Sequence, residues 1–284
     1  YCFFSRYNFI YFFISMKNIL LSFCIAASFT SCNNDPPPKV FKKKKEVVVK
    51  KKINSVKKTP KSSKDFYSNL INNSNVKKKL KDFARKNPSN KIKIITKYGS
   101  IKIKLYDDTP MHRGNFIMLA KKRFFDSTLF YRVINNFMIQ GGNSDKDNMF
   151  HKMAKIGNYK IPPEINKEHI HKRGALAMAV QEQYFMDPTK HDPSSSPYNF
   201  YIVQKGPLSN SYMDKIEKKY NIIIPKKNRN IYNSIGGNPH LDNQYTVFGE
   251  VISGMSVVDK IAKVITDGKN RPLKNVYLSI EVLN

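Results

Sequence analysis

Residues 130–142 bring together side chains that could bind and polarise an apolar ligand. They read Phe-Tyr-Arg-Val-Ile-Asn-Asn-Phe-Met-Ile-Gln-Gly-Gly. Alternation predicts two short strands around a turn, with Arg132 and Gln140 as hydrogen-bond donors beside the apolar Phe137 and Met138. Taken by itself, the stretch is more typical of a barrel strand with its Phe and Met in the core and a solvated arginine. Its chemistry therefore has to be judged together with the rest of the chain.

Three later segments complete an ordered set of motifs. Residues 174–179 read Gly-Ala-Leu-Ala-Met-Ala, residues 195–203 read Ser-Ser-Pro-Tyr-Asn-Phe-Tyr-Ile-Val, and residues 240–251 read His-Leu-Asp-Asn-Gln-Tyr-Thr-Val-Phe-Gly-Glu-Val. A helical segment follows them. Taken together with residues 130–142, these segments resemble the cyclophilin family of peptidyl-prolyl cis/trans isomerases. The resemblance covers residues 91–284.

The resemblance implies an all-β dominated fold, a closed eight-stranded antiparallel β-barrel capped by two α-helices. It also implies an outer groove that takes an X-Pro peptide, with no metal ion and no cofactor. By position, it implies that Arg132 and Gln140 are catalytic. The substrate-binding residues that it implies are Phe137, Met138, Ala179, Asn199, Tyr201, His240, Leu241 and Tyr245.

The chemistry expected of such a site needs no nucleophile and no proton relay. The barrier to rotation is the partial double bond of the amide, ~18–20 kcal/mol. Rotation leaves a lone pair on the prolyl nitrogen, so a guanidinium directed at that nitrogen stabilises the twisted state more than either planar state. Lysine would serve less well than Arg132, because an ammonium is more strongly hydrated and lacks the fork of donors.

Several positions depart from the better-known eukaryotic members of the family. The chain has no Trp, and His240 stands where a Trp is common, which argues against tight binding of cyclosporin. Asn199 replaces a Gln, Tyr245 replaces a pocket-lining His, and Val180 replaces an Asn. The residues expected to do the chemistry are kept, and we therefore expect catalysis. The alternative is a non-catalytic, membrane-tethered peptide-binding module.

The local pattern after residue 90 also predicts a barrel. Alternation over residues 91–105 around a glycine-containing turn predicts a β-hairpin. Thr109 and Pro110 suit the N-cap and first residue of a helix, and a second helix fits residues 257–264. Further strands are predicted at residues 129–134, 137–140, 174–179, 200–204, 246–252 and 276–283. A closed antiparallel barrel suits this pattern and leaves no exposed edge, so we expect a monomer.

The start of the chain has a pattern typical of an exported bacterial lipoprotein. Met16 is the first methionine, a lysine follows it, and an apolar run covers residues 19–29 before Thr-Ser-Cys. This is the layout of a secretory signal, and its end resembles a lipoprotein box. We expect residues 1–31 to be signal and upstream sequence, with translation starting at Met16. Lipid on Cys32 would then anchor the protein to a membrane of the bacterial cell envelope. The alternative is one transmembrane helix over residues 7–31.

Residues 32–90 are predicted to form a lysine-rich tether that is mostly disordered. Three consecutive prolines begin at Pro36, and clusters of lysine follow that repel one another and stay solvated. Apolar residues spaced over residues 65–86 predict a weak amphipathic helix in the last part of the tether. This helix is expected to end before Pro88.

The formal net charge of +29 favours nucleic acid or an anionic membrane as a partner. Lysine far outnumbers arginine, however, and guanidinium groups are the favoured tools for reading bases. We therefore expect a solvated basic surface, and nucleic-acid binding, if present, through the tether. All three cysteines lie within the first 32 residues, so no disulfide framework is expected in the rest of the chain.

Two further features have weaker signals. Residues 207–236 form an insertion, and the spacing of its apolar residues predicts one short helix. A tolerated surface insertion is favoured over an element of substrate specificity. His169 and His171 could share a metal ion if they lay on a strand, but no clear third ligand is present, and we expect no metal site.

Overall fold

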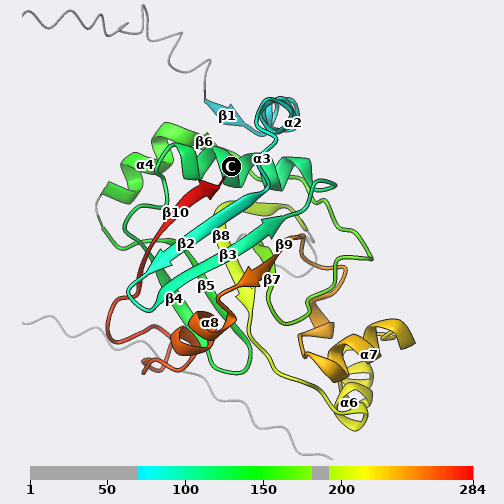
Figure 1. Ribbon diagram of the computed structural model, residues 1–284. Helices are drawn as coiled ribbons and strands as arrows, with labels where there is room; N and C mark the ends of the chain where they lie inside the picture. The colour runs from blue at the N-terminus through cyan, green and yellow to red at the C-terminus, as the bar shows by residue number, and fades with distance from the viewer. Residues whose placement is uncertain (1–69, 147, 181–191, 284) are drawn as a thin grey trace, which may run out of the picture. The chain divides into compact units, whose positions relative to one another are not determined.

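The computed structural model describes residues 70–146, 148–180 and 192–283 (Figure 1). The predicted signal segment, Cys32, and the alternative membrane helix over residues 7–31 lie outside the described residues. No helix in the described part of the chain is long and apolar enough to cross a bilayer.

Eight strands form a closed barrel in which every neighbouring pair is antiparallel. The order around the barrel is β10-β2-β3-β9-β7-β8-β5-β4, and β4 pairs back to β10. The strands are β2 (Lys91–Thr96), β3 (Gly99–Leu105), β4 (Thr128–Ile134), β5 (Met138–Asn143), β7 (Ala175–Val180), β8 (Ser195–Val203), β9 (Val247–Ser253) and β10 (Tyr277–Leu283). The predicted fold class is thus confirmed.

The barrel interior is filled by inward-pointing side chains, and β3 shows the alternation clearly. In β3, Ile101, Ile103 and Leu105 are fully buried, while the lysines between them are exposed. Successive side chains of a strand point to opposite faces, so this period-two pattern gives one face to the core and one to solvent. Inward side chains from the eight strands together form one continuous interior, although β-bulges interrupt the alternation in some strands, such as β4.

Two helices, α3 (Pro110–Lys121) and α8 (Met255–Ala262), lie at opposite ends of the barrel and pack into its core (Figure 1). Thr109 is the N-cap of α3 and Pro110 its first residue, as predicted. The capping acceptor is not the Thr109 hydroxyl, however. The carboxylate of Glu164 accepts the backbone N–H groups of Met111 and His112 at 3.0 and 2.9 Å. An anion suits these free N–H groups and the positive end of the helix dipole.

The folded body begins before the barrel. Residues 71–72 form β1 (Ile71–Asn72), which pairs in parallel with β6 (Gly157–Asn158), and α2 (Val76–Lys86) follows. The apolar stripe of α2 is buried against α3, and Gly114 permits the close approach, because a Cβ there would lie 2.7 Å from the Leu80 carbonyl oxygen. The helix predicted within residues 65–86 is therefore part of the fold, although the sequence analysis places it in the tether.

The described part of the chain has three further α-helices, so that its α-helices number six. They are α4 (Asn148–Ile156), α6 (Asn210–Tyr220) and α7 (Lys226–Ser234), and a short 3-10 helix, η1 (Pro239–Leu241), precedes β9. One helix was predicted in the insertion and two are present. The second was missed because Tyr232 is the one buried residue of α7, which leaves no apolar periodicity to detect.

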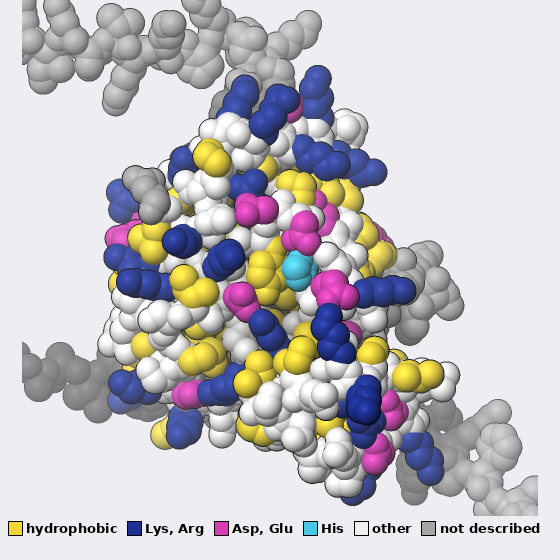
Figure 2. Space-filling model, turned by 45° about the vertical axis from the view of Figure 1, so that its right-hand side comes forward, with side chains coloured by type: hydrophobic (Ala, Val, Ile, Leu, Met, Phe, Trp, Pro, Cys, Tyr) yellow, Lys and Arg dark blue, Asp and Glu magenta, His cyan; other side chains and the backbone are white. Residues whose placement is uncertain are grey.

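On the face shown in Figure 2, basic side chains are spread out with acidic side chains among them. Several are paired across neighbouring elements, such as Lys172 with Glu250 at 2.6 Å and Arg173 with Asp259 at 2.6 Å. Part of the charge is therefore balanced locally. Pairs that lie at the surface contribute little to stability, with a median of about 0–1 kcal/mol when they are exposed.

Candidate active site

The strand register places predicted site residues in one row across neighbouring strands. Arg132 of β4 is opposite Gln140 of β5, Gln140 is opposite Tyr201 of β8, and Tyr201 is opposite Ala177 of β7. Ala177 is in turn opposite Val247 of β9. The residues next to them along the strands, such as Ile139 and Ile202, belong to the barrel interior. The row therefore lies on the outer face of the barrel.

A β-bulge in β4 puts two adjacent side chains on this outer face. The register shifts between Phe130 and Arg132, so Tyr131 is the extra residue of the bulge. Phe130 and Val133 both belong to the interior core. Phe130 and Val133 are three positions apart, so strict alternation would put them on opposite faces of the strand. The extra residue of the bulge lets both point inward and leaves Tyr131 and Arg132 outward. Bulges often redirect a side chain next to an active site.

Hydrogen bonds connect the polar members of the row. The guanidinium of Arg132 donates from Nη1 to Oε1 of Gln140 at 3.3 Å. The amide of Gln140 donates from Nε2 to the hydroxyl of Tyr131 at 2.6 Å. The amide orientation follows from these two bonds, since the oxygen must face the guanidinium. Gln140 thereby orients Arg132 while Tyr131 orients Gln140.

An apolar cluster, here called the outer cluster, lies beside this row. Its buried residues are Met138, Ala175, Ala177, Tyr201, Val203 and Val247, and those packed against them are Tyr106, Ile134, Phe137, Ala179, Leu241 and Tyr245. Six of the predicted substrate-binding residues belong to this set of twelve. The structure thus brings together side chains that the sequence scatters over more than a hundred positions.

Asn199 lies on the same outer face of β8. It precedes the inward-pointing Phe200 and is partly buried. Its Oδ1 atom is buried and has no hydrogen-bond partner among the described residues. A buried acceptor without a partner costs free energy, so it suits the binding of an N–H group from outside the chain.

A buried histidine supports the floor of the outer cluster. His171 is inaccessible to solvent, and its Nδ1 and backbone N–H lie 3.0 and 2.8 Å from Oδ1 of Asp242. With the proton on Nδ1, its Nε2 accepts the hydroxyl of Tyr201 at 2.9 Å. Tyr232 of the insertion donates to the other oxygen of Asp242 at 2.6 Å. Burial raises the pKa of Tyr201 well above its ordinary value, so this hydroxyl stays protonated.

His240 lies at the edge of the outer cluster, on η1. Its ring stacks on Phe137, with centroids 6.0 Å apart and planes 13° apart. Burial lowers the pKa of His240 from 6.5 to about 4, and the nearby His171 and Lys219 act in the same direction. The imidazole is therefore neutral near pH 7.

The two histidines considered as metal ligands, His169 and His171, have different partners. His169 pairs with Asp108 at 2.8 Å and stacks on Tyr106, whereas His171 is buried against Asp242. Over residues 70–146, 148–180 and 192–283 there is no group of three or more His, Cys, Asp or Glu that could hold a metal.

A second buried histidine, His112, lies between a carboxylate and a serine hydroxyl, as the histidine of a hydrolase catalytic triad does. His112 lies 2.7 Å from Glu164 through Nδ1 and 3.0 Å from the Ser195 hydroxyl through Nε2. Both His112 and Ser195 are inaccessible to solvent, at 1% and 0% exposure. A substrate could not reach the hydroxyl, so this network joins the start of β8 to the cap of α3.

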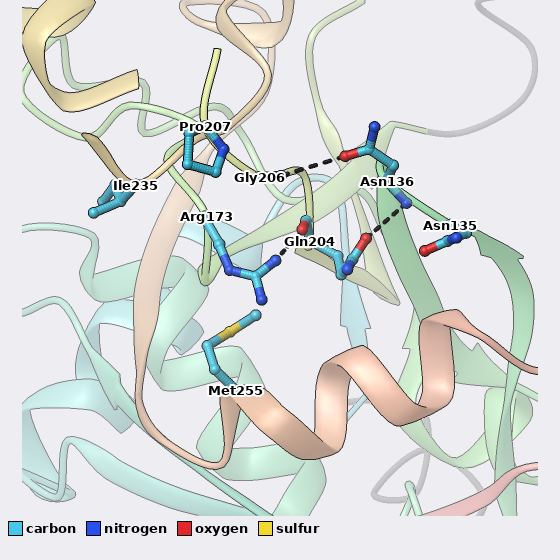
Figure 3. Close-up of a pocket in the computed structure, with 8 residues that line it drawn as sticks. All are labelled: Asn135, Asn136, Arg173, Gln204, Gly206, Pro207, Ile235 and Met255. Carbon is cyan, nitrogen blue, oxygen red and sulfur yellow. Dashed lines mark hydrogen bonds between the residues drawn. The ribbon is translucent and has the colours of Figure 1, made fainter. Parts of the chain in front are cut away.

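A cavity of about 870 Å³ lies outside the outer cluster (Figure 3). It is lined by Asn135, Asn136, Arg173, Gln204, Gly206, Pro207, Ile235 and Met255. None of the predicted site residues lines it. Arg173 is paired with Asp259 at 2.6 Å and also donates to the Gln204 carbonyl, so its charge is already balanced. The outer cluster remains the better candidate for the site.

Three residues of the site were not singled out from the sequence in these roles: Tyr131, His171 and Asp242. His171 was considered as a metal ligand only. Its true partner, Asp242, is 71 positions away, and no local pattern indicates a contact over that separation. Tyr131 lies within the first motif, but its outward orientation depends on the bulge.

Comparisons with known proteins agree with the motifs. Residues 91–282 match the family described as "Cyclophilin type peptidyl-prolyl cis-trans isomerase/CLD". A Staphylococcus saprophyticus protein, provisionally named a peptidyl-prolyl cis-trans isomerase, is 30% identical over 198 residues, covering 68% of this chain and 93% of that protein. A Streptococcus pyogenes protein, provisionally named a bifunctional phosphatase and peptidyl-prolyl cis-trans isomerase, is 31% identical, but the match covers 39% of its length.

Among solved structures, a Cryptosporidium parvum cyclophilin-type isomerase, crystallised in the presence of the dipeptide Ala-Pro, aligns with a TM-score of 0.48 and 21% identity. The alignment covers 68% of this chain and 99% of that one. The family match spans all of the barrel except its last residue, and the staphylococcal relative is matched over nearly its full length. On these grounds the chain belongs to the cyclophilin-type peptidyl-prolyl cis-trans isomerases.

Proposed function

We propose that this isomerase binds X-Pro segments of polypeptides on the outer cluster and that Arg132 stabilises the twisted amide. The observation that best supports the proposal is the row formed by Arg132, Gln140 and Tyr201. It puts a guanidinium next to an apolar surface on the outside of the barrel, within reach of a polypeptide.

The apolar residues suit a proline ring. Phe137, Met138 and Leu241 pack in the outer cluster beside the row, and we assign them to the proline ring. Such a surface gains by removing the ring from water, at roughly 25 cal/mol per Å² of apolar area. Asn199 would accept a backbone N–H of the substrate through its unpartnered Oδ1. Ala179 has a small side chain and leaves room for the residue before the proline.

The chemical step requires electrostatic stabilisation of a twisted amide. As the C–N bond rotates, resonance is lost and the prolyl nitrogen becomes a hydrogen-bond acceptor. Arg132 donates to this nitrogen, and Gln140 holds the guanidinium through a 3.3 Å hydrogen bond. The interaction is stronger in the twisted state than in either planar state, which is the condition for acceleration. No bond to a nucleophile forms, and no proton is transferred.

Replacing Arg132 tests the role of the guanidinium. We expect Arg132→Ala to lower kcat/KM for cis-to-trans conversion of an Ala-Ala-Pro-Phe peptide by about 10²–10³-fold, the usual loss when one transition-state donor is removed. The matched control is Arg123→Ala, at an arginine whose side chain is 83% exposed and which pairs with Asp126. Retention of full activity by Arg132→Ala would refute the role given to Arg132.

The same experiment distinguishes catalysis from binding alone. A folded wild-type protein that binds proline peptides without isomerising them would be a peptide-binding module. Binding is followed by NMR titration with the same peptide. In that case Arg132→Ala would leave both the peptide affinity and the absence of activity unchanged.

We further propose that lipid on Cys32 anchors the protein to a membrane of the bacterial cell envelope, where it assists exported proteins to fold. The support is the sequence pattern that precedes Cys32. Uncatalysed X-Pro isomerisation takes tens to hundreds of seconds and can limit folding. Labelled palmitate should enter the wild-type protein and not Cys32→Ser. Equal labelling of both would refute the anchor.

A further inference from the structure

The insertion over residues 207–236 is a packed unit with a small core of its own. This core consists of Ile170, Leu208, Met213, Ile216, Ile224 and Tyr232. Arg229 of α7 pairs with Glu217 at 2.9 Å and also with Asp214, which joins the two helices. The ends of α6 and α7 are therefore held in defined positions.

The insertion contacts the candidate site at two points. Tyr232 of α7 donates to Asp242 at 2.6 Å, directly after Leu241 of the outer cluster. Tyr220, the last residue of α6, stacks on His240 with centroids 4.8 Å apart and planes 17° apart. A tolerated surface insertion would need neither contact.

Three rings form a continuous stack from the insertion to the proposed proline pocket. Tyr220 lies against His240, and His240 lies against Phe137 at 6.0 Å with planes 13° apart. Tyr220 remains 41% exposed, so part of its ring is open to a ligand. Because His240 is uncharged near pH 7, the stack presents a mainly apolar surface. Its rim is basic, since Lys219 lies 5.1 Å from the Tyr220 ring centroid.

We propose that Tyr220, His240 and Phe137 form a subsite for an aromatic side chain that follows the proline of the substrate. This inference rests on the proposed function, which places the residue before the proline at Ala179 and the proline ring at Phe137. The chain after the proline then continues over His240. An extended chain advances ~3.3–3.6 Å per residue, so the first two residues after the proline reach the rings of His240 and Tyr220.

An aromatic side chain suits this subsite better than an aliphatic or charged one. Ring pairs gain from offset or edge-to-face contact beyond their buried area. A cationic side chain would meet Lys219, whose ammonium already lies by the Tyr220 ring. A small side chain would leave the exposed part of Tyr220 in water.

The test compares two peptides, Ala-Ala-Pro-Phe-Ala and Ala-Ala-Pro-Ala-Ala, by NMR exchange rates and by binding titrations. We expect the wild-type protein to favour the phenylalanine peptide in kcat/KM by a factor of about 2–12, the worth of one aromatic pair. In Tyr220→Ala this preference should fall to about one. Tyr220→Phe, which keeps the ring, should retain it.

Tyr212→Ala is the matched control. Tyr212 lies on the same helix at nearly the same exposure, 42%, but contacts Lys205 and not His240. It should keep the wild-type preference. If Tyr220→Ala keeps that preference, or lowers both rates equally, the subsite is refuted.

The two proposals fail in different ways. If the wild-type protein isomerises neither peptide, the proposed function is overturned. The ratio of the two dissociation constants would then decide the subsite, because binding needs no catalysis. A ratio of about one in the wild-type protein would overturn the subsite even if both peptides were isomerised rapidly.

Discussion

The two faces of the same strands differ in chemistry. On β8, Phe200 and Ile202 point into the barrel, and Tyr201 and Val203 point out. On β5, Ile139 points in, between outward neighbours. The inward side chains beside this row, Ile139, Phe200 and Ile202, are purely apolar. The outward ones include the Tyr201 hydroxyl and the Gln140 amide, and Gln140 lies between Tyr201 and Arg132 in the register.

This difference separates stability from function along a single strand. The interior gains mainly from close packing, and a buried polar group there, such as the Tyr159 hydroxyl, is paired within the fold, in this case with Asn115. The outer face keeps polar groups that a ligand can use. A change at one position should therefore affect mainly stability, and a change at the next should affect mainly activity. Paired substitutions test how complete the separation is.

The largest difference in stability is expected between variants of two phenylalanines on opposite faces of the barrel wall, Phe200 and Phe137. Phe200 is fully buried and its ring lies 5.3 Å from Phe116 and 5.8 Å from Phe125. Phe200→Ala should lower the free energy of unfolding by about 3–5 kcal/mol, measured with urea. Phe137 is partly exposed, so Phe137→Ala should cost about 1 kcal/mol. It should instead lower kcat/KM about tenfold, since ~1.4 kcal/mol of lost binding is a factor of ten.

Equal losses of stability from Phe200→Ala and Phe137→Ala would break the comparison. So would a folded Phe200→Ala protein without activity. The assay should therefore be run at a urea-free concentration and temperature where circular dichroism shows Phe200→Ala to be folded.

The next prediction compares the hydroxyl partners of two buried histidines, His112 and His171. Each donates to a carboxylate and accepts a hydroxyl: His112 from Ser195 at 3.0 Å, and His171 from Tyr201 at 2.9 Å. Ser195→Ala and Tyr201→Phe each leave a buried ring nitrogen without its partner. Each should lower the free energy of unfolding by about 1–3 kcal/mol.

Activity should distinguish these two variants. Ser195 lies in the network that caps α3, whereas Tyr201 belongs to the outer cluster. Tyr201→Phe should therefore raise KM, and Ser195→Ala should not. A raised KM in Ser195→Ala would show that the two networks are coupled.

Much of this arrangement could be predicted from local sequence. Period-two alternation located the barrel strands, and the motif string contained Arg132, Phe137, Met138 and Gln140 together. Such features depend on neighbours within a few residues. The family resemblance added Asn199 and the residues around His240, which the barrel then brought to the same face.

Features that depend on long-range contacts could not be predicted. The bulge at Tyr131 results from two core residues that both need to point inward. The pairing of β1 with β6 joins segments 86 residues apart, and no local pattern indicates it. The stack of Tyr220 on His240 joins two residues 20 positions apart, and it depends on how the whole insertion folds. The spacing that predicted a helix here was correct, but it did not show which face met the site.

The smallest effect concerns the dependence of stability on pH. His240 has a pKa lowered to about 4 in the folded protein, mainly by burial, against 6.5 in the unfolded chain. Between these values the unfolded chain binds a proton that the folded protein does not. Stability therefore falls as the pH is lowered from about 6.5 toward 4. His240→Phe should reduce this slope, and it keeps a ring against Phe137.

Urea unfolding at pH 7, 5.5 and 4.5 measures the slope. Asp192 also loses stabilisation in acid, but its pKa is lowered to about 2, so its contribution disappears only below about pH 4. The exposed His151 provides the control, and His151→Phe should keep the slope. An unchanged slope in His240→Phe would mean that the ring at the edge of the outer cluster is more hydrated than its stacking implies. The outer face would then differ from the interior in its access to water as well as in its polar groups.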